Sequence, residues 1–191
     1  EGGGDAPALH GQATLSRYPI VSAKILRYRA QSDFWRPRWY VPNWSALQRR
    51  QGGRMALRVA VDTGAGRLVV YNTHLESRGP ESRRAAQMDE AIEDARSVPP
   101  GVVTVIAGDF NTRDRPSEVI LRASGAGFES AVADEPPTAA PRPRSIVRSL
   151  YAGLPFGFGA DRDRLQRTLD WFLVRGPVGG LQGEVRSSAA G

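Results

Sequence analysis

The sequence contains no cysteine, and only two of its 191 residues are histidines. Without cysteine the chain has no disulfide, no zinc site built from thiolates and no thiol nucleophile. None of its apolar runs approaches the roughly 20 residues that a membrane-spanning helix needs. We therefore expect a soluble protein without a transmembrane segment, and the composition does not distinguish a cytoplasmic from a secreted one.

Lysine is almost missing as well. Lys24 is the only lysine among 26 basic residues, and the formal net charge is +6. One interpretation is the coding bias of a G+C-rich bacterial genome. The other is an anionic substrate, because arginine binds phosphate through two parallel hydrogen bonds and a positive surface attracts anions. Basic and aromatic residues form no compact stripe, so the charge alone does not predict a nucleic-acid interface.

Apolar residues make up 40% of the chain, enough for one substantial core, and we expect a single domain over residues 1–191. Residues 1–11 are predicted to be a flexible start, and the Pro- and Arg-rich residues 134–160 a long surface loop. Apolar periodicity and turn residues predict the following elements: strands at 13–16, 21–28, 54–62 and 67–75, and helices at 80–97 and 116–123.

The most informative stretch is Val102–Thr112, an apolar β-branched run that ends in Gly-Asp-Phe-Asn. It places Asp109 and Asn111 at the mouth of a buried strand, where ligands of open α/β sheets bind. If the chain stays extended through Phe110, the two side chains point the same way. A carboxylate beside a carboxamide suits the activation of water near a phosphate. The alternative is a plain Asp-Phe-Asn-Thr turn, and this segment alone leaves both open.

His74 ends a second β-rich run, Arg67–Glu76. Strand alternation places Asn72 and His74 on one face. A lone histidine is often structural, but an imidazole can also protonate a leaving oxygen or bind a phosphoryl group.

Asp170 lies near the start of a third strand, among Leu169, Trp171 and Phe172. A carboxylate buried among such neighbours requires a partner. The alternative is an edge strand on which Asp170 faces solvent.

Together these segments resemble the endonuclease/exonuclease/phosphatase superfamily of metal-dependent phosphoesterases. The resemblance spans about Gly11 to Gly176 and rests on four motifs in this order: Ala13–Ile20 with its Leu-Ser-Arg, Asn72–Leu75, Gly108–Asn111 and Leu169–Trp171. It implies an α/β fold, the two-sheet sandwich of DNase I-like proteins with helices on the outside.

The resemblance also implies roles for individual residues. His74 would contact the scissile phosphate, Asp109 would orient or deprotonate the attacking water, and Asn111 would hydrogen-bond a phosphate oxygen. Asp170 would support a second catalytic histidine, and Arg17 would be a substrate or structural contact beside the site. The implied cofactor is Mg²⁺, or Mn²⁺ in its place.

Two family motifs have no counterpart in the sequence. The principal metal ligand of the family is a Glu on an early strand, which we expect upstream of Glu1. The family's terminal Ser-Asp-His has no match between Gly183 and Gly191. The sequence is thus expected to be an internal piece of the domain, incomplete at both ends and nearly inactive alone.

The expected function of the whole protein is hydrolysis of a phosphoester in nucleic acid, a phospholipid head group or a sugar phosphate. The alternative is a non-catalytic relative that binds nucleic acid or phosphate-rich partners. We expect a monomer without a stable protein partner. Residues 34–44 hold three of the four tryptophans, and they form either a substrate-facing aromatic loop or a loop pinned on the core by its rings.

Overall fold

The computed structural model describes residues 11–33, 38–40, 42, 53–77, 79–112, 117–131 and 169–179. Its centre is a six-stranded mixed sheet in the order β1-β2-β3-β4-β6-β5. The elements in chain order are β1 (Ile20–Arg27), β2 (Met55–Asp62), β3 (Arg67–His74), α1 (Glu81–Ala95), β4 (Val103–Asp109), α2 (Glu118–Gly125), β5 (Glu129–Ser130) and β6 (Asp170–Arg175). The expected α/β class is confirmed.

The first three strands form an antiparallel meander, and β3 then pairs with β4 in parallel through the connection that contains α1. The β2–β3 hairpin turns at Thr63–Gly66, where the N–H of Thr63 donates to the carbonyl of Gly66. β6 pairs antiparallel with β4 and lies between β4 and the short edge strand β5. The predicted hairpin and both helices are thus present within one or two residues of their expected bounds.

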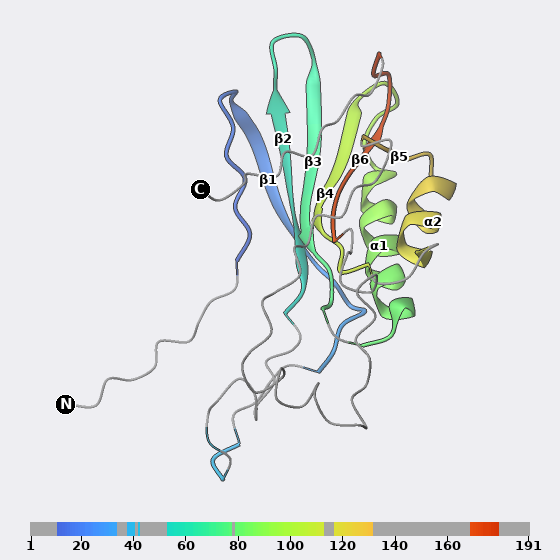
Figure 1. The fold of residues 1–191 in the computed structure, drawn as a ribbon. Helices are drawn as coiled ribbons and strands as arrows, with labels where there is room; N and C mark the ends of the chain where they lie inside the picture. The colour runs from blue at the N-terminus through green and yellow to red at the C-terminus, as the bar shows by residue number, and fades with distance from the viewer. Residues whose placement is uncertain are drawn as a thin grey trace, which may run out of the picture.

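Helices α1 and α2 cover one face of the sheet (Figure 1). The predicted stripe of α1 is buried throughout, at Ala85, Met88, Ile92 and Ala95. It belongs to the same core as the sheet residues Tyr71, Ile106 and Leu173. Each large apolar side chain buried in this way contributes about 1.5–3 kcal/mol to stability, so the stripe fixes the helix against the strands.

The opposite face of the sheet carries apolar residues that are only partly covered, among them Leu68, Val70 and Val103. Phe172 on this face is 47% exposed and Ile25 is 54% exposed. Within the described ranges the chain forms one sheet with helices on a single side, and the second sheet of the expected sandwich is not among these residues.

Residues 13–16 are not a strand, contrary to the prediction. This segment instead lies across the face of the sheet opposite the helices. Asn72 is on that face because it alternates with the helix-facing Tyr71 and Thr73. Its side-chain amide donates to the carbonyl of Ala13 at 2.9 Å. The side chain of Gln12 bonds the main chain of β2 at Met55 and Leu57. Hydrogen bonds of side-chain amides thus take the place of the backbone ladder that the alternation of apolar and polar residues predicted.

Candidate active site

Three neighbouring strands place polar residues in one row. His74 at the end of β3 pairs in register with Asp109 at the end of β4, and Asp109 pairs with Asp170 at the start of β6. Directly paired residues share a face of the sheet. The row therefore lies on the face opposite the helices, at one end of the sheet.

His74 and Asp109 are close enough to act together. The Nε2 atom of His74 lies 3.7 Å from Oδ2 of Asp109, with 45% and 32% of the two side chains exposed. This separation is too long for a direct hydrogen bond, but it suits an ion pair with a protonated imidazole. The pair is open to solvent and to a ligand.

Asn111 reaches the site through a turn, because β4 ends at Asp109 and the chain does not stay extended through Phe110. Asn111 adopts a left-handed conformation, with φ of 51°. Its N–H donates to Oδ1 of Asp109 at 2.8 Å, and its Nδ2 donates to the carbonyl of Leu75 at 3.0 Å. The turn interpretation is therefore correct, and this turn joins the ends of β3 and β4.

The pKa of the Asp109 carboxyl is raised above its ordinary value. Burial is the main cause, and the charge of Asp170 acts in the same direction. The N–H of Asn111 and the positive charges of His74 and Arg54 act against it. A carboxylate with a raised pKa accepts a proton more readily, which is what a general base requires.

Asp170 is exposed, whereas the sequence favoured a buried carboxylate. It does not lie on an edge strand either, because β6 lies between β4 and β5. The start of β6 is held instead by Trp171, whose Nε1 donates to Oγ1 of Thr112 at 2.9 Å in a buried bond. This contact was not predicted from the sequence. Its only signal was a tryptophan N–H in a strand, which needs an acceptor when buried.

Arg17 is not brought to this row. It lies over the ring of Tyr18 at 5.0 Å and donates to its hydroxyl. The nearby carbonyl of Pro19 accepts from the N–H of Asp62, at the hairpin end of β2. His74 lies at the other end of the sheet.

Arg54 and Glu76 lie beside the row and were also missed. Glu76 is fully buried two residues after His74, and Arg54 donates to the main-chain carbonyl of His74. The signal in the sequence was Arg54 at the start of the predicted strand 54–62 and Glu76 directly after its predicted hairpin partner 67–75.

The described residues do not form a metal site by themselves. Within these ranges no three His, Cys, Asp or Glu side chains are grouped closely enough to hold an ion. The row of one imidazole and two carboxylates therefore does not fit a complete Mg²⁺ site. A cavity of about 560 Å³ lined by Arg58, Arg67 and Val102 lies at the hairpin end of the sheet, away from this row.

No helix in the described part of the chain is both long and apolar enough to cross a membrane. Of the aromatic loop, only residues 38–40 and Pro42 are described. Trp39 is 95% exposed and packs edge-on against Tyr40, so this part of the loop is not pinned on the core. Residues 134–160 and 1–10 lie outside the described residues.

Comparison with known proteins finds one matching family model and several similar structures. A family model described as "Endonuclease/Exonuclease/phosphatase family" matches residues 2–190. An endonuclease/exonuclease/phosphatase protein from Beutenbergia cavernae DSM 12333 is similar in structure, with 21% identity and a TM-score of 0.50 over 84% of this chain and 39% of the other. Sphingomyelinase C from Streptomyces griseocarneus has 19% identity and a TM-score of 0.52 over 84% and 50%.

These identities show a shared fold, and the chain spans half or less of the length of both structures. A search of the curated proteins finds no match.

Proposed function

Because the chain belongs to the endonuclease/exonuclease/phosphatase family, whose members are phosphoester hydrolases, we propose that its site hydrolyses a phosphoester with water as the nucleophile. The observation that carries this proposal is the row at the strand ends, with 3.7 Å between His74 Nε2 and Asp109 Oδ2. Hydrolysis needs a base for water and donors for the phosphoryl oxygens. A purely structural role would not require these groups to converge on a partly exposed face.

Asp109 is the proposed base or orienting group for water. Its Oδ1 accepts the N–H of Asn111, and this bond fixes the rotation of the carboxylate. Its Oδ2 faces the imidazole of His74. Burial raises the pKa of Asp109, which increases its basicity. A water bound between Oδ2 and the phosphorus atom would lose its proton to this oxygen.

His74 and Asn111 are the proposed contacts to the phosphoryl oxygens. A protonated imidazole donates a charge-assisted hydrogen bond to such an oxygen. The carboxamide of Asn111 is already oriented by its bond to Leu75, so its position is set before a substrate arrives. Asp170, paired with Asp109 across the strands, completes the row and would orient a further polar group.

We further propose that hydrolysis depends on Mg²⁺ or Mn²⁺. The ion would neutralise negative charge on the phosphoester. Since the described residues do not make up a metal site, its principal ligand has to come from outside them, and we assign no step to it.

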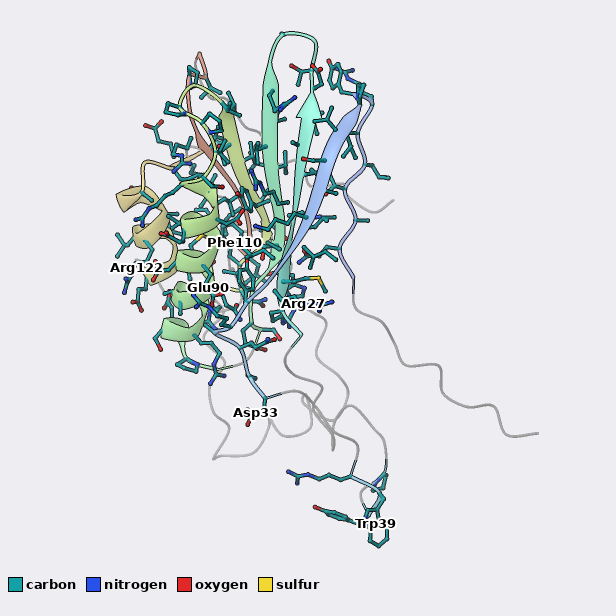
Figure 2. The ribbon with its side chains drawn as sticks, turned by 180° about the vertical axis from the view of Figure 1, so that it is seen from behind. Arg27, Asp33, Trp39, Glu90, Phe110 and Arg122 are labelled. Atoms are coloured by element: carbon teal, nitrogen blue, oxygen red, sulfur yellow. The ribbon has the colours of Figure 1, made fainter. Side chains whose placement is uncertain are left out.

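Nucleic acid, phospholipid head groups and sugar phosphates all remain as substrate classes. One structural relative is a sphingomyelinase, named for sphingomyelin. Figure 2 shows Trp39 beyond the end of the sheet at which β1 ends in Arg27, and the β1–β2 and β2–β3 registers place His74 at that same end. An exposed aromatic side chain there favours a base or a lipid over a bare sugar phosphate.

The test is a substrate panel with the full-length protein. Single-stranded and duplex DNA, sphingomyelin vesicles and an inositol phosphate are incubated with Mg²⁺ and, separately, with a chelator. We expect chelator-sensitive release of product from one class. Binding of phosphate-rich partners without any turnover would instead support the non-catalytic alternative.

A further inference from the structure

Glu76 lies next to the row and carries a buried carboxylate. This carboxylate has no part in the proposed reaction. Its side chain is 1% exposed, and Oε1 lies 3.8 Å from Nε of Arg54. Oε2 accepts the N–H of Ser32 at 3.3 Å. Removing a carboxylate from water is costly unless a positive charge and donors replace its hydration. Arg54 supplies that charge.

Arg54 in turn contacts the strand that carries His74. Its Nη1 makes a long hydrogen bond of 3.5 Å to the carbonyl of His74, and its Nη2 donates to Oγ of Ser77 at 3.1 Å. Its side chain is only 19% exposed. The guanidinium therefore joins the end of β3 to the loop that follows it.

Helix α1 fixes the same loop from the other side. Gln87, fully buried, accepts the N–H of Glu76 with Oε1 at 2.9 Å and donates to the carbonyl of Ala30 at 2.7 Å. Gln31 accepts the N–H of Arg54 at 3.0 Å. Ala30 and Gln31, before residues 34–52, and Arg54, after them, thus belong to the same hydrogen-bonded group as the main chain of His74.

We propose that Arg54 is a positioning residue for this site: held by the buried carboxylate of Glu76, it fixes the main chain at His74 and places a permanent positive charge behind the His74–Asp109 pair. The catalytic consequence rests on the proposed function. The placement of the charge does not depend on it.

The electrostatic environment of Asp109 supports this role. Among the described residues, the charged groups that act on its carboxyl are His74 from β3, Asp170 from β6 and Arg54 just before β2. The N–H of Asn111, in the same turn as Asp109, also acts on it. Arg54 is the group in this set whose charge is permanent and positive. It lowers the pKa of Asp109 and so opposes the effect of burial.

The test is the titration of Asp109 in the full-length protein and its variants, followed by carboxyl-carbon NMR. Arg54→Met removes a positive charge and should raise the pKa of Asp109. Glu76→Gln removes the negative charge but keeps an amide oxygen in the place of Oε1 to hold Arg54, so it should lower the pKa of Asp109. Arg54→Lys keeps the charge and should leave the titration close to that of the wild type. Shifts of opposite sign are the signature of charge, since general loosening of the site would move both variants in the same direction.

Arg58→Met is the matched control, because Arg58 pairs with Asp94 at 3.5 Å and is similarly shielded, with 25% of its side chain exposed. It should leave the titration of Asp109 unchanged. An unchanged pKa in Arg54→Met, or shifts of the same sign in Arg54→Met and Glu76→Gln, would overturn the proposal. If Arg54→Met does not fold, Glu76→Gln decides the question, because it leaves no carboxylate buried without a partner.

The catalytic consequence is measured separately, in the full-length protein. Arg54→Met should move the acid limb of the pH–rate profile to higher pH, while Arg54→Lys restores the limb and recovers only part of kcat. Absence of turnover in the wild type would refute the proposed function while leaving the titration result intact. Turnover with an unmoved acid limb would refute the role of Arg54 alone.

Discussion

Gly108 lies so close to Thr73 that no other residue fits in its place: a Cβ atom at position 108 would lie 2.0 Å from the Thr73 carbonyl oxygen. Gly108 also has a φ of 132°, which side chains with a Cβ rarely adopt. These residues pair in register on β3 and β4, one position before His74 and Asp109. The close approach of the two strands thus sets the spacing of His74 and Asp109, the proposed catalytic pair.

Gly108→Ala should therefore destabilise the fold by on the order of 3 kcal/mol, since it adds a clash with backbone to a strained φ. The measurement is chemical denaturation followed by circular dichroism. Gly64→Ala is the control: Gly64 also has a positive φ, but open space surrounds its Cβ position, and the cost should be only about 1–2 kcal/mol. Equal losses in the two variants would show that the contact with Thr73 is unimportant.

The bond between Trp171 and Thr112 should hold the start of β6 against the turn after β4. Thr112→Val leaves the indole N–H without this acceptor in a buried place, at a cost of about 1–3 kcal/mol. Trp171→Phe removes the donor. If the bond matters, the double variant should lose less stability than the sum of the two single variants. Strict additivity in the same denaturation experiment would argue against the bond.

Asp109 should lower the stability of the fold at neutral pH. Because burial raises its folded pKa, the stability associated with its protonated form is fully present below the unfolded pKa and is lost as the pH rises through the folded pKa. Asp109→Asn should accordingly be more stable than the wild type at pH 7. This advantage should disappear below about pH 4, the ordinary value for aspartate. A variant that is less stable at pH 7 would contradict this view of the site.

Asp94 should show the opposite pH dependence. Burial alone would raise its pKa, but hydrogen bonds from Lys24 and Tyr71 and the charge of Arg58 lower it below the ordinary value. Its contribution to stability is present above the unfolded pKa and is lost as the pH falls through the folded one. Asp94→Asn should cost up to about 1 kcal/mol at pH 7, discounted for the exposed Lys24, and nothing in acid. Denaturation midpoints at the two pH values measure the difference.

Much of the sheet and the helices could be predicted because their signals are local. The buried stripe of α1 follows the helical period, and Thr63–Gly66 marks the hairpin. The strand predicted at 13–16 failed because Ala13 and Leu15 alternate with polar residues as in a strand, yet Leu15 is 97% exposed.

The arrangement of the site was harder to predict because its contacts are distant in sequence. Trp171 and Thr112 are 59 residues apart, and Gln87 bonds two separate loops. The left-handed turn at Asn111 is permitted by asparagine but not required by it. The placement of Arg54 beside Glu76 likewise depends on the β2–β3 register, which no single motif encodes.

The most direct test of the account is turnover of the responsive substrate by full-length variants. His74→Ala and Asp109→Asn should each lower kcat/KM by about 10²–10⁴-fold, while circular dichroism remains that of the wild type. Arg122→Ala, a change in an exposed residue paired with Glu118 on α2, should have no effect. Wild-type turnover in either site variant would contradict the claim that the paired ends of β3 and β4 form the hydrolytic site.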